Sequence, residues 1–433
     1  MRVKRILWIP VILLTITLQA QDKPKKWNLS ACIDYALNNN IQIQKAKISL
    51  EGNQVSTLQA KAQLLPTLSA SVNQNAGYSP SGSVGTYSGS YGINSSMTLF
   101  NGGQNLKSIQ QQKLQEEVGQ YSILESEKSI QMSILQIYAQ ILYADEAVKV
   151  YDETVKTSQY QLDRGKKLLR AGSISSADLA QLESQLSSDK YQLIVAQNTL
   201  STAQLEMRQL LELNPEDTIN VEIPALTNIN ILKPVGSLQT IYETALNVIP
   251  QIKSTKVDQK VSELETAKAK AAFLPTVSLS GSVSTGHTTN SDYNIGTQLN
   301  DALYAGVGVS VNIPIFSNRE NKSNLEKARL NEKTVKLETL DTEKSLLKEI
   351  ESVYQDALSA QSQYVAASEK VKALETSYNL IEQQYTLGMK NTLELLTGKN
   401  NLLSARQSMM QAKYLSIMDI QILNLYQDIY PWK

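Results

Sequence analysis

Few side chains in this chain of 433 residues have the chemistry of a catalytic or metal site. The sequence contains one histidine, His287, and one cysteine, Cys32. One residue of each type cannot build a clustered His/Cys metal site or the ordinary Ser-His and Cys-His nucleophile pairs. Cys32 lies in an apolar helix pattern, which predicts a small buried side chain and no disulfide. The sequence therefore predicts a protein that is not an enzyme and needs no cofactor or metal.

One short segment partly matches the sequence motif of a phosphate-binding loop. Gly398-Lys399-Asn400 matches the Gly-Lys of such a loop, but Asn400 replaces the Ser or Thr that should follow. Leu393 also stands where the first glycine of the loop belongs. We therefore interpret the segment as a solvated helix face. Carboxylates such as Glu116 lie on predicted long helices, where surface charge is the expected role.

The charge balance excludes one class of partner. Lysine plus arginine and aspartate plus glutamate number 41 each, so the formal net charge is zero. A chain without a basic field has no general attraction for nucleic acid, and we expect no nucleic-acid partner.

The N-terminus has the pattern of a secretory signal peptide. Arg2, Lys4 and Arg5 precede an apolar run over residues 6–18, and Ala20 is a small residue at the expected cleavage point. An uncleaved anchor is the alternative, although the run is shorter than the ~20 apolar residues that span a bilayer. We assign residues 1–20 to a signal peptide.

The rest of the chain is an internal duplication. Leu65-Pro66-Thr67-Leu68-Ser69 returns as Leu274-Pro275-Thr276-Val277-Ser278, and each copy continues into a helix pattern, a glycine and a second helix pattern. The duplication predicts the following domains: a first repeat at 21–214, a linker at 215–236, a second repeat at 237–430 and a C-terminal tail at 431–433.

Two long stretches without proline predict long helices. No proline occurs between residues 81 and 214 or between residues 315 and 430. Within them apolar residues recur at alternating spacings of four and three, as in Ile130, Ile134, Ile137 and Ile141, which is the heptad pattern of a coiled coil. We expect one long helical hairpin at 102–214 and another at 318–430, preceded by helical pairs at 28–64 and 237–272.

Between the helices the apolar period changes from that of a helix to that of a strand. Alternation of apolar residues with Ser, Thr, Asn and Gly predicts four strands, at about 66–78, 87–100, 275–285 and 302–315. Residues 79–86 and 287–300, which include His287, read as surface hairpin loops. Alternation at Ile219, Val221 and Ile223 permits one more short strand.

The four strands are long enough to cross an outer membrane when tilted, and their polar faces suit a wet lumen. The alternative is a soluble β-sandwich layer attached to the helices. Four strands leave open edges, whereas the smallest membrane barrels have about eight strands. If the strands lie in a membrane, several chains must share one barrel, and three chains would supply twelve strands.

The two hairpin tips correspond to each other in sequence. Gly172 and Gly388 can adopt the left-handed conformation that ends a helix. The pairs Ser175 with Asp178 and Asn391 with Glu394 then have the spacing of caps that start the next helix. A plain helical turn explains this pattern without any function. Apolar residues at the far end of long hairpins argue for more, and they are Ile174, Met389 and Leu393.

In its signal peptide, duplicated element order, Leu-Pro-Thr strand entry and glycine-centred tips, the chain resembles the TolC-like outer-membrane efflux family. The resemblance covers essentially the whole mature chain. It implies a mainly α fold with four strands per chain, assembled as a homotrimer. The trimer shares a 12-stranded outer-membrane β-barrel in contact with lipid, and a long α-helical coiled-coil barrel extends into the periplasm.

The resemblance also implies site residues. In the family, the closed end is held by contacts from a Tyr and a basic residue to an Asp and a Thr, which match Tyr385, Lys390 and Asp178, while Ala177 replaces the Thr. Glu394 is either one member of an acidic ring that favours cations or a helix cap. These four matches make up the implied periplasmic gate: Tyr385, Lys390, Asp178 and Glu394. The implied adaptor contacts are Gly172, Ser173, Ile174, Gly388, Met389 and Leu393.

The resemblance implies a passive export duct, the outer-membrane channel of a tripartite efflux or type I secretion system. Its partners would be a periplasmic adaptor protein and an inner-membrane pump of the RND or ABC type. The alternative is a structural or adhesive surface protein of the outer membrane that uses the coiled coil as a stalk.

Overall fold

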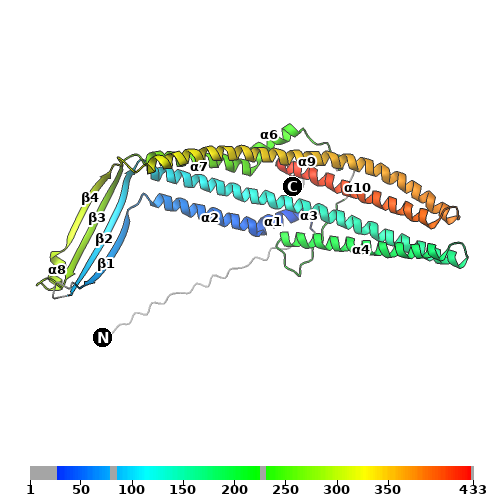
Figure 1. The fold of residues 1–433 in the computed structure, drawn as a ribbon, viewed down its shortest axis with the longest axis horizontal. Helices are drawn as coiled ribbons and strands as arrows, with labels where there is room; N and C mark the ends of the chain where they lie inside the picture. The colour runs from blue at the N-terminus through cyan, green and yellow to red at the C-terminus, as the bar shows by residue number, and fades with distance from the viewer. Residues whose placement is uncertain (1–26, 79–84, 225–230, 431–433) are drawn as a thin grey trace, which may run out of the picture.

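The computed structural model describes residues 27–78, 85–224 and 231–430. A four-stranded sheet lies at one end of a long, narrow molecule, and helices run away from it to two hairpin tips at the other end (Figure 1). The expected signal peptide at 1–20 and the tail at 431–433 lie outside the described residues.

The helices repeat in both kind and length. Those of the first half are α1 (Leu29–Asn39), α2 (Ile41–Ala62), α3 (Gln104–Arg170) and α4 (Ser176–Leu210). Those of the second half are α6 (Leu238–Val248), α7 (Pro250–Ala271), α9 (Glu320–Thr386) and α10 (Thr392–Tyr426). Both α3 and α9 have 67 residues, so each is about 100 Å long at 1.5 Å per residue. None of the described helices is apolar and long enough to cross a membrane.

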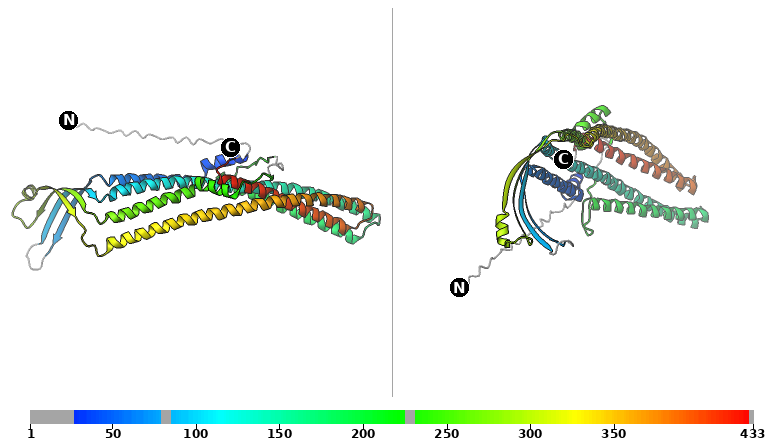
Figure 2. Two further views of the ribbon diagram at one scale, coloured as in Figure 1. Left: turned by 90° about the horizontal axis from the view of Figure 1, so that it is seen from above. Right: turned by 60° about the vertical axis from the view of Figure 1, so that its left-hand side comes forward.

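The sheet joins the two halves of the chain. It contains β1 (Thr67–Gly77), β2 (Thr86–Asn101), β3 (Thr276–Thr288) and β4 (Tyr304–Asn312). All neighbours are antiparallel in the order β1-β2-β3-β4, so the halves meet where β2 pairs with β3. The sheet is curved (Figure 2). The expected mainly α fold with four strands per chain is confirmed.

The second half of the sheet differs from the sequence-based prediction in three places. His287 belongs to β3 instead of a loop, and its ring stacks on Tyr91 with centroids 5.9 Å apart. The connection to β4 contains a short helix, α8 (Ile295–Asp301). Strand β4 ends at Asn312 instead of continuing to 315, because Pro314 has no N–H to donate to a ladder.

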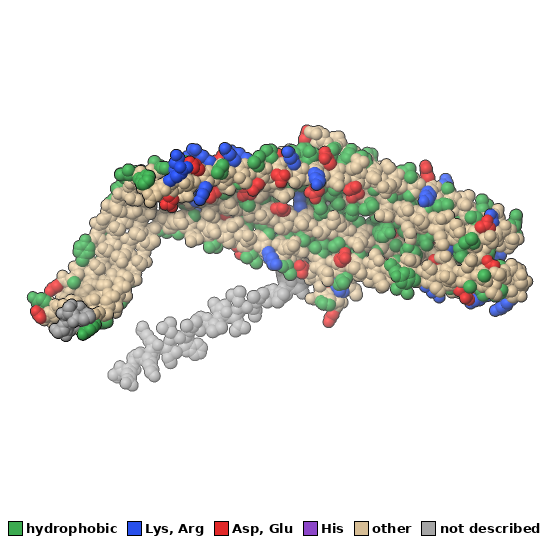
Figure 3. Space-filling view, viewed as in Figure 1, with side chains coloured by type: hydrophobic (Ala, Val, Ile, Leu, Met, Phe, Trp, Pro, Cys, Tyr) green, Lys and Arg blue, Asp and Glu red, His purple; other side chains and the backbone are tan. Residues whose placement is uncertain are grey.

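The strand register separates the side chains into two faces. Val72 pairs with Tyr91, and Leu279 with Val309, on a largely apolar face. The other face is lined by hydroxyl, amide and glycine residues. Among those residues are Ser71, Asn94, Ser282, Ser280 and Gly308. None of the four described strands contains Asp, Glu, Lys or Arg, and charged side chains gather over the helices instead (Figure 3).

Each half has its own apolar core beside its long helix. In the first, Ile134 of α3 and Cys32 of α1 are fully buried. In the second, Ile350 of α9 packs among residues of α6 and α10. Burial raises the pKa of the Cys32 thiol to about 12, as suits the expected small core side chain. The short strand permitted near Val221 is an isolated parallel bridge to Trp27.

One carboxyl group is buried beside the second core. Asp419 of α10 is only 6% exposed. Burial, and secondarily the charge of Asp356 on α9, raise the pKa of Asp419 to about 7. The native state therefore keeps a proton that the unfolded chain releases near its ordinary value of 3.8.

Because of this group, the free energy of unfolding should fall by on the order of 4 kcal/mol as pH rises from about 4 to about 7, and it should stay level above pH 7. Asp419→Asn removes that loss, so it should raise the melting temperature of the purified protein at pH 8 and change it little at pH 4. The exposed Asp341→Asn is the control. An equal gain at both pH values would contradict the assignment.

Candidate functional site

The two hairpin tips end their helices in the same way. Gly172 and Gly388 have φ angles of +71° and +73°, as the glycine pattern predicts. The chain then folds back onto the last helical turn, with the Ser173 amide donating to the Leu168 carbonyl at 2.9 Å. This is the hydrogen-bond pattern of a glycine-terminated helix, and it brings α4 back along α3 (Figure 1).

Each returning helix starts with a reciprocal cap, also as predicted. The Asp178 amide donates to the Ser175 hydroxyl at 3.1 Å, and the Ser175 amide donates to the Asp178 carboxylate at 3.0 Å. Asn391 and Glu394 repeat the arrangement at 2.9 and 3.0 Å. Hydrogen bonds from Ser175 lower the pKa of Asp178, so the carboxylate is charged at neutral pH.

A cavity of about 570 Å³ lies between the two tips. The structure brings all four predicted gate residues to its lining, together with some of the predicted adaptor contacts. The lining includes Asp178, Tyr385, Lys390, Glu394, Ser173, Ile174, Gly388 and Met389. Gly172 and Leu393 lie outside the lining, and Leu393 is 63% exposed. Met389 is 70% exposed, so apolar surface borders the cavity.

Within one described chain, the gate residues do not contact one another as the resemblance implies. The Tyr385 hydroxyl is buried and has no hydrogen-bond partner among the described residues. Lys390 forms its ion pair with Glu394 instead of Asp178. The other carboxylate oxygen of Glu394 accepts from the Asn391 amide, so Glu394 is a helix cap whose charge is balanced by Lys390.

The sequence interpretation missed a buried ion pair close to the tips. Lys399 of α10 is 5% exposed and Asp189 of α4 is 3% exposed. The Lys399 ammonium group donates to the Asp189 carboxylate and to the Ser158 hydroxyl of α3. The interpretation of Lys399 as part of a solvated helix face is therefore wrong. We call Lys399, Asp189 and Ser158 the anchor.

A signal for the anchor was present in the spacing. Lys399 stands four residues after Leu395 and three before Leu402, both of which are buried in one cluster. Asp189 follows the buried Leu186 by three residues. Two opposite charges thus occupy core positions of apolar heptads, where an unpaired charge is unfavourable.

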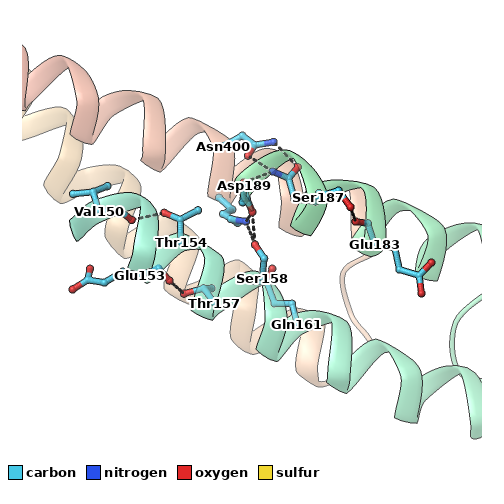
Figure 4. A network of polar contacts seen from close by, with 12 residues as sticks. Val150, Glu153, Thr154, Thr157, Ser158, Gln161, Glu183, Ser187, Asp189 and Asn400 are labelled. Atoms are coloured by element: carbon cyan, nitrogen blue, oxygen red, sulfur yellow. Dashed lines mark hydrogen bonds and ion pairs between the residues drawn. The ribbon is translucent and has the colours of Figure 1, made fainter. Parts of the chain in front are cut away.

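The anchor is closed by further hydrogen bonds (Figure 4). Gln185 donates to the second carboxylate oxygen of Asp189 at 2.9 Å, and the side-chain amides of Gln185 and Asn400 bond to each other at 3.2 and 3.3 Å. Both oxygens of the buried Asp189 carboxylate therefore have partners. Burial lowers the pKa of Lys399, and the hydrogen bond and charge of Asp189 oppose that shift.

The anchor belongs to a longer contact between the two hairpins, which we call the seam. Its apolar contact is made by Leu396 of α10, which packs among leucines of the first hairpin. Its polar contacts join residues of α3 to residues of α9 and α10. They are Arg164 with the Thr386 carbonyl, Gln161 with Tyr378, Tyr151 with Gln407, and Glu146 with Lys413 and Tyr414.

Solved structures share this fold. The chain of CusC, whose structural report concerns transmembrane channel formation, has a TM-score of 0.80 and 18% identity, covering 92% of this chain and 91% of that chain. The outer membrane protein VceC from Vibrio cholerae has a TM-score of 0.77 and 15% identity, covering 92% of this chain and 96% of that chain.

Relatives in sequence have the same extent. The outer membrane efflux protein BepC of Brucella suis is 21% identical over 386 residues, 89% of this chain and 82% of that protein. The outer membrane protein TolC of Escherichia coli is 20% identical over 398 residues, 89% of this chain and 79% of that protein.

The family model described as "Outer membrane efflux protein" matches residues 32–212 and 241–426, which include both hairpins and all four strands. These proteins are channels of the outer membrane with helical extensions into the periplasm. This chain belongs to the outer membrane efflux protein family.

Proposed function

We propose that this chain is the outer-membrane subunit of a tripartite efflux or type I secretion system. It forms a homotrimeric, passive duct that is opened at its periplasmic tips by an adaptor protein and an inner-membrane pump of the RND or ABC type. The observation that supports this proposal most directly is the four-stranded sheet, with one apolar face, one uncharged polar face and two unpaired edges.

The edges argue for a shared barrel. In the described chain β1 pairs only with β2, and β4 only with β3. An unpaired backbone group in hydrocarbon costs several kcal/mol, so an open sheet edge does not persist in lipid. Sister chains can close the edges, and three copies give twelve strands. The polar faces then line a wet lumen, and the apolar faces meet the lipid.

The tips argue for a gate. They lie at the opposite end of the molecule from the sheet, about 100 Å of helix away, where an adaptor can reach them from the inner membrane. Exposed apolar residues such as Met389 and Leu387 offer the adaptor a surface. Opening is a shift between two tip arrangements, driven by adaptor contacts that favour the open one.

An adhesive surface protein with a coiled-coil stalk is the rival function. It needs no lumen and predicts no ion flow. The purified trimer should give discrete conductance steps in a planar lipid bilayer, and deletion of the gene should reduce tolerance of exported compounds. A protein that inserts into the bilayer without carrying current would contradict the duct.

The tip cavity gives a test of the gate. Tyr385→Phe removes a buried hydroxyl that we propose bonds to Asp178 in the closed trimer, so the resting conductance should rise by severalfold. Asp178→Ala should raise it as well, but this variant also loses the Asp178 half of the capping box that starts α4. Ser175→Ala weakens the same cap and keeps the Asp178 carboxylate, so it is the matched control. Unchanged conductance in Tyr385→Phe and Asp178→Ala would exclude both as latches.

The two faces of the sheet give a second test. Val283 and Ser282 are neighbours in the middle of β3 and point to opposite faces. Val283→Lys should impair membrane assembly by ~2–4 kcal/mol, because a charge on the lipid face is poorly solvated. Ser282→Lys should assemble normally and shift the channel toward anion selectivity, measured as the reversal potential in a salt gradient. The opposite pattern would mean that the faces are assigned wrongly.

A further inference from the structure

We propose that the anchor formed by Lys399, Asp189 and Ser158 is the pivot of the gate: the hairpins separate on its tip side and stay joined on its far side. This inference rests on the proposed duct and adds the place where its moving part begins. Lys399 is seven residues from Thr392, the first residue of α10, so the moving part is about 10 Å deep on that helix.

The anchor resists separation of the hairpins. Its ammonium group and carboxylate are both buried, and each has at least two hydrogen-bond partners. Pulling α10 away from α3 and α4 would leave a carboxylate and an ammonium group without partners in an apolar surrounding, which is strongly unfavourable. The two hairpins therefore stay in contact at the anchor while weaker contacts of the seam change.

The tip side of the seam is less well satisfied. The side-chain carbonyl of Gln161 and the Nε of Arg164 are buried and lack partners in the described chain. Both lie between the anchor and the tips, one to two helical turns from Ser158 on α3. Buried polar groups without partners lower the stability of the arrangement that contains them, so a second arrangement can compete with it.

Directly beyond the anchor, from Tyr151 and Gln407 to Glu146 and Tyr414, none of the described seam residues has a buried polar atom without a partner; such atoms recur only farther along α3 and α10, at Gln131, Gln421 and Asn424. Glu146 accepts hydrogen bonds from Lys413 at 2.7 Å and from Tyr414 at 2.5 Å. Tyr151 accepts from Gln407. The stretch of paired contacts directly beyond the anchor can therefore stay fixed while the tip side of the seam moves.

Thiol cross-links on either side of the anchor test the pivot. In a Cys32→Ala background, which removes the single native thiol, Arg164→Cys with Thr386→Cys bridges the seam on the tip side. Tyr151→Cys with Gln407→Cys bridges it on the far side. Each trimer is treated with a short, reducible cross-linker and recorded in planar bilayers before and after reduction.

The tip-side cross-link should abolish the large openings, and reduction should restore them. The far-side cross-link should leave them unchanged. Equal inhibition by both cross-links, or no inhibition by the tip-side one, would overturn the pivot while leaving the duct in place. Absence of current from every sample, before cross-linking as well, would overturn both.

A charge cycle tests the anchor residues themselves. Lys399→Met leaves Asp189 buried without its counter-charge, so the closed seam should loosen and the open probability should rise severalfold. Lys399→Met with Asp189→Leu replaces the pair by apolar side chains of similar size, and should return the open probability toward that of the unmodified protein. If the single variant forms trimers and gates normally, the anchor has no part in opening. If it does not assemble, Ser158→Ala replaces it: this variant keeps the ion pair and removes one partner of the Lys399 ammonium group, so the open probability should rise, and normal gating would exclude the anchor from opening.

Discussion

Backbone hydrogen bonding is the constraint on which the molecule depends. Each strand pair in the sheet satisfies its donors and acceptors through an antiparallel ladder, but β1 and β4 each leave one edge unpaired in a single chain. In a membrane these edges determine the assembly, because lipid offers no hydrogen bonds in place of water. The alternation of apolar and uncharged polar side chains then follows, since one face meets lipid and the other meets water.

The helical part, which is also duplicated, has a different requirement: the register between its two hairpins must be specified. Within a hairpin, neighbouring helices can pack through apolar heptads, as Leu395 and Leu402 do. Such heptads accept a slip of seven residues at little cost, so they fix the contact without fixing its register. Among the described ion pairs, Lys399–Asp189 alone has both side chains buried. A slip would separate these charges, so the pair specifies the register between the hairpins.

The sequence predicted features that depend on local patterns and missed those that depend on distant residues. Heptads, strand alternation, the glycines at the tips and both capping boxes are encoded within a few residues, and the structure confirms them. Lys399 needs a partner 210 residues away to be buried, and no local pattern reports that partner. The position of His287 was missed because β3 extends further than its apolar alternation. The seam contacts join different helices, so they required coordinates.

The placement of charge connects the two ends of the molecule. The strands carry no Asp, Glu, Lys or Arg, and at the tips Lys390 balances Glu394. Charge is abundant along the helices, where water and salt screen it, and is absent from the described strands, whereas the tip cavity holds the charged Asp178 carboxylate beside the Lys390–Glu394 pair. A lumen lined by uncharged strands does not select solutes by the sign of their charge, so any such selection by a passive duct would arise at the tips. Among the described ion pairs, the one with both side chains buried lies in the seam, away from the sheet that would line the passage, and its proposed role is that of the pivot.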